Sequence, residues 1–197
     1  MPAPSPPPRP RTKPPEVRRE ELMDAAEKLF LAKGIAATSI DEIVAAADVA
    51  KGTFYIHFPS KEHLLIALRQ RFVAGFLGVL QAAIDHRPPS DWTGRLCAWV
   101  EAGVDFYLAE AARHDIVFHE FQPDNRHAPQ PNPVVDQLAQ LLEQGNRAAA
   151  WSAEDPRLTA IMLFHALHGA VDAKTDIDRE RLARRLETFF RRAVGLG

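Results

Sequence analysis

The chain has 197 residues, of which 46% are hydrophobic and 25% are charged, with 24 Lys and Arg against 26 Asp and Glu. This composition is typical of a globular protein with a buried core, and a single cysteine excludes a disulfide framework or a zinc site built on paired cysteines. The longest stretch without a charged residue, 158–171, is too short to span a bilayer, and no secretory signal is visible. We therefore expect a cytoplasmic protein that is not inserted in a membrane.

The charge is spread unevenly along the chain. Residues 1–75 carry 11 Lys and Arg against 9 Asp and Glu, and the first 15 residues contain 8 of the 16 prolines. Because proline lacks a backbone N–H and disfavours helices, residues 1–15 are expected to form a disordered arm. The basic residues Arg9, Arg11 and Lys13 in this arm suit a polyanion, although a solvated tail without a partner has the same composition.

Apolar residues recur at intervals of three and four, and no segment alternates with the period of a strand. We therefore expect an all-α protein of about nine helices. In chain order, the expected elements are 17–33, 40–47, 50–57, 61–85, a helix from residue 91, a short element near 116–121, 134–151, 156–174 and 179–194. Ser39 with Glu42 indicates a capping box, Gly34 ends the first helix, and Asp155 precedes Pro156 at a helix start.

The three segments nearest the N-terminus have the lengths and the tight turn of a helix-turn-helix. On this interpretation Ile43, Val49, Phe54 and Phe58 face inward, as the apolar spacing indicates. The residues expected to face outward on the third helix are small or carry hydrogen-bond donors, which suits entry into a major groove: Lys51, Gly52, Thr53, Tyr55 and His57. The helix starts at Ser39 and Ser60, the second reinforced by Lys61, can hold phosphates. A solvated helix face remains the alternative.

The run Gly52-Thr53-Phe54-Tyr55-Ile56-His57-Phe58, followed by Ser60-Lys61-Glu62, resembles the TetR family of bacterial transcriptional regulators. The resemblance covers about 16–76. It implies a DNA-binding domain at 16–76, with its helix-turn-helix at 39–58, and an effector-binding and dimerisation domain at 77–197. The turn departs from the family at Asp48, where Gly is usual, and Ala50 replaces a common Ser. Aspartate tolerates the left-handed conformation better than most residues, so the turn is expected to survive.

The resemblance also implies which residues contact DNA. Lys51, Gly52 and Thr53 match base-contacting positions. The positions that match phosphate contacts are Thr38, Tyr55, His57 and Lys61, and Ser39 joins them by its place at a helix start. The expected recognition helix lacks Arg, Asn and Gln, so we expect sparse direct readout supplemented by DNA shape and the basic arm.

The same resemblance implies that the protein would be a homodimeric, ligand-responsive repressor of operator DNA. The last two helices, 156–174 and 179–194, would pair across a two-fold axis. Gly169 would permit close helix approach there, although a simply tolerated glycine is an equal explanation. Effector binding would tilt the long helix 61–85 and so change the separation of the two DNA-binding domains.

The middle helices are expected to hold the pocket for a small-molecule effector of unknown identity. Its candidate lining residues are mostly aromatic: Phe72, Phe76, Trp92, Trp99, Phe106, Tyr107, Phe118, Phe121 and Met162. The candidate polar anchors are Glu101, Asp105, Glu120 and His165. Aromatic residues at helical spacing also form ordinary cores, and that alternative stays open.

Four histidines are candidate ligands for a metal ion. His114 and His119 lie close in sequence, as do His165 and His168, and His-x-x-His can bind Zn²⁺ or Ni²⁺. Since no His-Glu-x-x-His motif or cysteine partner accompanies them, we expect no metal and no cofactor. No Gly-rich phosphate loop or Gly-x-Ser-x-Gly motif occurs, and Cys97 lies in an apolar helix, so we do not expect an enzyme. The alternatives are a helical ligand- or metal-binding adaptor without DNA binding and an all-α enzyme.

Overall fold

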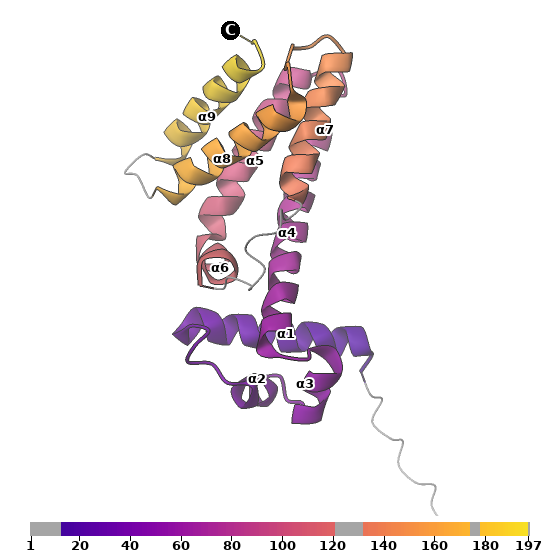
Figure 1. Cartoon of the computed structure of the whole chain (residues 1–197), viewed down its shortest axis with the longest axis vertical. Helices are drawn as coiled ribbons and strands as arrows, with labels where there is room; N and C mark the ends of the chain where they lie inside the picture. Colours follow the sequence, from indigo (N-terminus) through magenta and orange to yellow (C-terminus); the bar gives the residue numbers. More distant parts are fainter. Residues whose placement is uncertain (1–12, 121–131, 174–177, 197) are drawn as a thin grey trace, which may run out of the picture. The chain divides into compact units, whose positions relative to one another are not determined.

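The computed structural model describes residues 13–120, 132–173 and 178–196, and every regular element in these ranges is helical (Figure 1). This confirms the expected all-α class for the described part of the chain. The helices are α1 (Pro15–Lys33), α2 (Ile40–Ala46), α3 (Lys51–His57), α4 (Lys61–Asp85), α5 (Trp92–Ala109), α6 (Ala111–His114), the π-helix η1 (Asp115–Glu120), α7 (Pro133–Arg147), α8 (Pro156–Asp172) and α9 (Arg179–Ala193).

The chain divides into two compact units, Met1–Leu68 and Arg69–Gly197. The division falls inside α4, as does the domain boundary that the resemblance places after residue 76. Residues 1–12, which make up most of the expected basic arm, lie outside the described residues.

The first unit begins with α1, which starts two residues earlier than expected because Pro15 occupies its first turn, where proline's missing N–H costs nothing. Gly34 ends this helix at φ 81°, and its N–H donates to the carbonyl of Phe30 at 2.8 Å. Ser39 and Glu42 form the expected capping box at the start of α2. Local sequence signals therefore determine where α1 ends and α2 begins.

The turn between α2 and α3 is built around Asp48, which adopts φ 53°. Asp48 therefore adopts the left-handed conformation that was predicted for this position, where Gly is usual. The N–H of Val49 donates back to the carbonyl of Val44 at 3.0 Å, which closes the turn. Phe54 and Phe58 are 0% and 2% exposed, so α3 is anchored by its aromatic side while its opposite side is free.

The second unit is built from the remainder of α4 and from α5 to α9, with α5 packing against α8 and α9, and α7 against α8 (Figure 1). Its core includes Trp99, which is fully buried 5.9 Å from the ring of Phe190. The indole N–H of Trp99 donates to the side-chain oxygen of Gln137 at 3.2 Å, so its one polar atom is satisfied.

Helix α7 ends at Arg147 rather than at the expected residue 151. The chain reverses at Ala149, with φ 54°, and Trp151 folds back to donate its indole N–H to the carbonyl of Leu142 at 2.9 Å. A Cβ on Gly145 would lie 2.0 Å from the Trp151 ring, so only glycine fits beneath it. Trp151 therefore caps the end of α7 instead of extending it.

Helix α4 is the one described helix that is long and apolar enough to cross a membrane by length and composition alone. Core helices of soluble proteins pass the same test. Leu64 and Leu68 are buried in the first unit, and Phe76 and Leu80 belong to the core of the second. Burial in these two cores accounts for part of the apolar character of the helix, since 33% of its membrane-length apolar window is buried.

Candidate nucleic-acid interface and ligand site

The outward side of α3 carries most of the residues that the sequence predicted for DNA contact. Lys51 and Gly52 are exposed, Tyr55 is 50% exposed, and Thr53 and His57 are half-buried. A Cβ built on Gly52 would meet no atom within 4 Å, so the protein itself does not require glycine at this position. The absence of a side chain leaves the α3 backbone open to approach by another molecule.

Sequence reasoning missed Ile56 on the same helix. It is 80% exposed, far more than the other large apolar residues of the described chain. An exposed branched side chain on a helix with a free face suits an apolar contact such as the methyl group of thymine. The available signal was its position directly between Tyr55 and His57, both of which were predicted to face outward.

Lys51 is paired with the carboxylate of Asp41 in the first turn of α2. This hydrogen-bonded carboxylate raises the pKa of the Lys51 ammonium group. Lys51 is therefore a cation that already has a protein partner in the free protein.

The residues predicted to hold phosphates near α2 have partners within the protein. Thr38, which matches a phosphate-contact position, is 1% exposed, and its hydroxyl donates to the carbonyl of Gly34 at 2.8 Å. The Ser39 hydroxyl is used in the capping box. The Lys61 ammonium donates to the carbonyls of Ile35 at 2.8 Å and Thr38 at 2.9 Å. These three side chains hold the loop between α1 and α2 in place.

In the second unit, the predicted pocket aromatics pack against one another. The rings of Phe76 and Phe106 stack at 4.8 Å, and Phe76 meets Tyr107 edge-on at 5.0 Å. Phe72 lies 5.2 Å from Phe106 and 5.7 Å from Phe118. These five residues come together as predicted, but they fill the space between them, which is the alternative of an ordinary core.

The other predicted lining residues lie elsewhere. Trp99 belongs to the core beside Phe190, and Trp92 packs on Trp151. Met162 is 56% exposed and His165 is exposed, so neither lines an internal cavity in the described structure. Phe121 lies outside the described residues.

The predicted polar anchors do not gather around the aromatic cluster. Asp105 forms an ion pair with Arg179, and Glu101 and Glu120 are exposed. Glu101 and Asp105 instead line a surface hollow of about 390 Å³. The rest of its lining includes Ala82 and Ala83 near the end of α4 and His86 just after that helix.

A smaller cavity of about 150 Å³ lies where α5, α6 and α8 meet. Its polar lining consists of Tyr107, His114, Asp115, His168 and Asp172. Pockets for drug-sized ligands have volumes of roughly 300–1,000 Å³. This cavity therefore suits a small ligand or an ion better than a large planar molecule.

His114 is the buried centre of this polar group, at 4% exposure. Its Nε2 lies 3.1 Å from Nε2 of His168, and its ring stacks on Phe118 at 4.8 Å. Burial lowers the pKa of His114 to about 4, with a smaller contribution from His168, and burial also lowers the pKa of His168. Both imidazoles are therefore neutral at pH 7.

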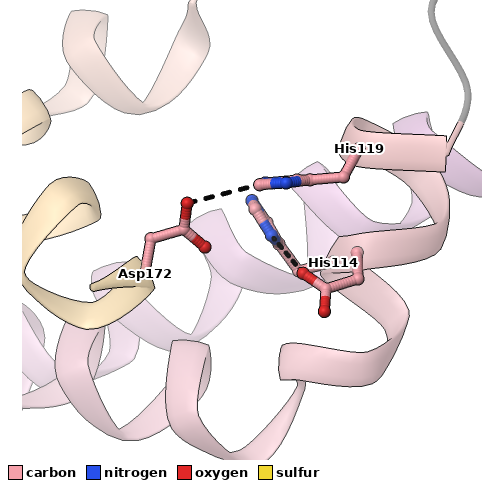
Figure 2. A group of neighbouring side chains, drawn as sticks. His114, His119 and Asp172 are labelled. Atoms are coloured by element: carbon pink, nitrogen blue, oxygen red, sulfur yellow. Dashed lines mark ion pairs between the residues drawn. The ribbon is translucent and has the colours of Figure 1, made fainter. Parts of the chain in front are cut away.

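Two further groups extend the cluster. His119 Nε2 lies 3.8 Å from a carboxylate oxygen of Asp172, and both point toward His114 (Figure 2). From the sequence, His114 was grouped with His119, and His168 was grouped only with His165. No sequence pattern indicated that Asp172 lies beside these histidines.

Comparison with known proteins places these features in a family context. Residues 22–68 match the family described as "Bacterial regulatory proteins, tetR family". The chain is 31% identical over 141 residues to the HTH-type transcriptional repressor KstR2 of Mycolicibacterium smegmatis, covering 67% of this chain and 68% of that protein. It is 35% identical over 105 residues to the HTH-type transcriptional activator FasR of the same organism, covering 53% of this chain and 47% of FasR. The chain thus spans less than half the length of FasR.

Solved structures show the same fold. A tetR-family bacterial regulatory protein from Rhodococcus RHA1 matches with a TM-score of 0.67 and 24% identity, covering 91% of this chain and 98% of that chain. A complex of SmeT with triclosan matches with a TM-score of 0.64 and 21% identity, covering 90% and 91% of the two chains.

Proposed function

We propose that the chain, which belongs to the TetR family of bacterial regulatory proteins, is a cytoplasmic DNA-binding repressor that acts as a homodimer and is released from its operator by a small ligand. The observation that carries this proposal is the free face of α3. Its aromatic side is buried through Phe54 and Phe58, while Lys51, Gly52 and Tyr55 are exposed on a short helix that follows a tight turn. A major groove admits a helix of this kind.

The interface that we propose is narrower than the predicted one. It consists of the α3 residues Lys51, Gly52, Thr53, Tyr55 and His57 with the newly identified Ile56. We assign Thr38, Ser39 and Lys61 to holding the α1–α2 loop, whose backbone then approaches the phosphates.

Exposed apolar residues on the last two helices support a homodimer. Leu158 and Met162 on α8 are 50% and 56% exposed, and Phe189 on α9 is 50% exposed. His165 and Gly169 are also exposed on α8, and with the first two residues they follow the spacing of one helix face. A Cβ on Gly169 would meet no atom within 4 Å in a single chain, so the chain leaves room there for a neighbouring helix. Pairing would bring two copies of α3 to half-sites about 34–36 Å apart.

A ligand can release such a repressor only if it binds the form that cannot hold DNA more tightly. Helix α4 begins in the first unit and continues into the second, which makes it the element through which ligand binding would act. SmeT is a fold relative that forms a complex with triclosan, and we extend ligand binding in the second unit to this chain as part of the proposal.

Selection from a pool of random DNA duplexes tests the proposal, because the selection itself identifies the sequence that the protein binds. We expect repeated selection with the full chain to enrich a two-fold symmetric sequence. Fluorescence anisotropy should then show affinity for that duplex falling steeply with salt, because phosphate contacts release counterions.

Two variants sharpen the test. Tyr55→Ala and Ile56→Ala truncate side chains that are 50% and 80% exposed, so they should weaken binding of the selected duplex while circular dichroism and the melting temperature stay near those of the parent. Leu108→Ala, at a residue that is 44% exposed in the second unit, serves as the matched control. If no sequence is enriched, or if the α3 variants bind like the control, the proposal is wrong.

A further inference from the structure

Four potential metal ligands from three elements of the second unit lie around His114: His168 contacts its ring nitrogen, and His119 and Asp172 offer ligand atoms within 4.8 Å of it. His114 ends α6, His119 lies in η1, and His168 and Asp172 lie in the last turns of α8. The π-helix explains part of this arrangement, because its i→i+5 hydrogen bonding brings residues five apart onto one face. The rings of His114 and His119 are accordingly 5.2 Å apart (Figure 2).

Two pairs of donor atoms have spacings close to those of ligands on one ion. Nitrogen ligands at 2.0–2.1 Å from a tetrahedral zinc ion are roughly 3.3 Å from one another. His114 Nε2 and His168 Nε2 are 3.1 Å apart, and His119 Nε2 and Asp172 Oδ2 are 3.8 Å apart. The ligand atoms offered by His114, Asp115, His119 and Asp172 all lie within 4.8 Å of one another. The side chains of His119 and Asp172 are 46% and 39% exposed, so small rotations can close the remaining gaps.

Neighbouring side chains fix the orientation of the His114 ring. Asp115 Oδ1 lies 3.8 Å from its Nδ1, on the side away from Nε2, where a closer approach would give the hydrogen bond that a metal-binding histidine commonly donates to a carboxylate. Phe118 stacks on the ring, and Tyr107 meets it edge-on at 5.2 Å, so the imidazole is held in one position.

A hydrogen bond between two neutral imidazoles accounts for the His114–His168 distance without any ion. It does not account for the approach of His119 and Asp172 to His114. A carboxylate and three imidazoles form a ligand set that zinc accepts, and the adjoining cavity of about 150 Å³ leaves room for a water molecule or a small oxygen donor.

We infer that the second unit binds one divalent transition-metal ion of the zinc type through His114, His119, His168 and Asp172, with Asp115 orienting His114. This reverses the expectation from sequence that no metal is bound. The inference concerns the second unit alone and does not depend on DNA binding.

Isothermal titration of the chelator-treated full chain with Zn²⁺ at neutral pH tests it directly. We expect saturable binding of one ion per chain. Titration with Co²⁺ should give the intense visible absorption of a tetrahedral nitrogen and oxygen site. Loss of a supporting carboxylate costs about 10–100-fold in metal affinity, so Asp115→Asn should weaken Zn²⁺ binding by that factor.

The two half-exposed ligands provide the decisive variants, because their replacement need not disturb the core. His119→Ala and Asp172→Asn should each weaken Zn²⁺ binding by at least about a hundredfold, whereas the exposed His86→Ala should bind Zn²⁺ like the parent. The inference is wrong if the parent shows no saturable binding, or if both ligand variants bind with the parent's affinity. Failure of the DNA selection would leave these outcomes unchanged.

Discussion

The ammonium nitrogen of Lys51 lies 2.7 Å from a carboxylate oxygen of Asp41, which joins the first residue of α3 to the first turn of α2. The two side chains are 53% and 70% exposed, so solvent screens the pair and it adds little to stability. Its larger effect is on binding, because a DNA phosphate must compete with Asp41 for the same cation.

Removing this competitor should strengthen DNA binding. We expect Asp41→Asn to raise the affinity for the selected duplex several-fold at low salt and less at high salt, since the interaction is screened. Fluorescence anisotropy over a salt series measures the effect. Glu154→Gln, an exposed position in the second unit, changes the net charge equally and should leave the affinity unchanged. An unchanged affinity in Asp41→Asn would show that Asp41 does not compete with DNA, and a reduced affinity would show that the pair organises the binding surface.

Gly52 allows stability to be separated from binding. Because a Cβ here meets nothing within 4 Å, Gly52→Ala should stabilise α3 by up to about 1 kcal/mol through helix propensity. If DNA approaches this backbone closely, the same variant should bind the selected duplex at least about tenfold more weakly. Thermal unfolding and anisotropy measure the two effects, with Gly78→Ala in α4 as the control, which should be stabilised without loss of binding. Full binding by Gly52→Ala would remove this residue from the interface.

Lys61 should act on the fold rather than through a direct contact. Its ammonium group donates to the carbonyls of Ile35 and Thr38, and hydrogen bonds to charged groups contribute about 1.5–3 kcal/mol. Lys61→Met keeps the aliphatic stem but removes both donors, so it should lower the free energy of unfolding by an amount in that range. Chemical denaturation measures the loss. A parent-like midpoint in Lys61→Met, combined with weakened DNA binding, would instead support the predicted phosphate contact.

The success of the sequence analysis in the first unit has a physical basis. The capping box of Ser39 and Glu42 and the turn at Asp48 each depend on residues within a few positions of one another, so their signals are local. The contact between Lys61 and Ile35 joins residues 26 positions apart and depends on helix packing. Nothing in the local pattern distinguishes a lysine that binds phosphate from one that binds two carbonyls.

The second unit shows the same limit more strongly. His114 and His168 are 54 positions apart, so their contact depends on how α6 and η1 pack against α8. Helical periodicity places Met162 with other apolar residues on one face of its helix. Periodicity alone cannot show whether such a face packs into the core or remains at the surface of the chain. Met162, which was predicted to line the pocket, is 56% exposed in the single chain.

Glu42 gives the first unit a defined response to acid. Its hydrogen bond to Lys33, followed by those from Ser39, lowers the pKa of its carboxyl group from 4.5 to about 2. Because the folded pKa is depressed, the contribution of Glu42 to stability is present above pH 4.5 and is lost as the pH falls through 2. The carboxyl carbon of Glu42 should therefore titrate near pH 2 by nuclear magnetic resonance.

The matched variant checks the same linkage by unfolding. Glu42→Gln should melt below the parent at neutral pH, and the difference should shrink as the pH falls toward 2. Glu143→Gln, which removes an exposed carboxylate paired with Arg147, should show a smaller difference. A gap between Glu42→Gln and the parent that does not change with pH would contradict the assigned pKa.

The exposed face of α8 makes the proposed homodimer testable. Met162 is 56% exposed in the single chain, and pairing of α8 with its symmetry mate would bury two copies of it together. Met162→Glu would then bury two like charges without partners, which costs several kcal/mol, so dimer affinity should fall at least about a hundredfold. Sedimentation over a concentration series measures this loss. Met162→Leu conserves volume and should keep the dimer, and Val79→Glu, at an exposed apolar residue of α4, should also keep it. Sedimentation of Met162→Glu as the parent's dimer would place the interface elsewhere, and a monomeric parent would rule the dimer out.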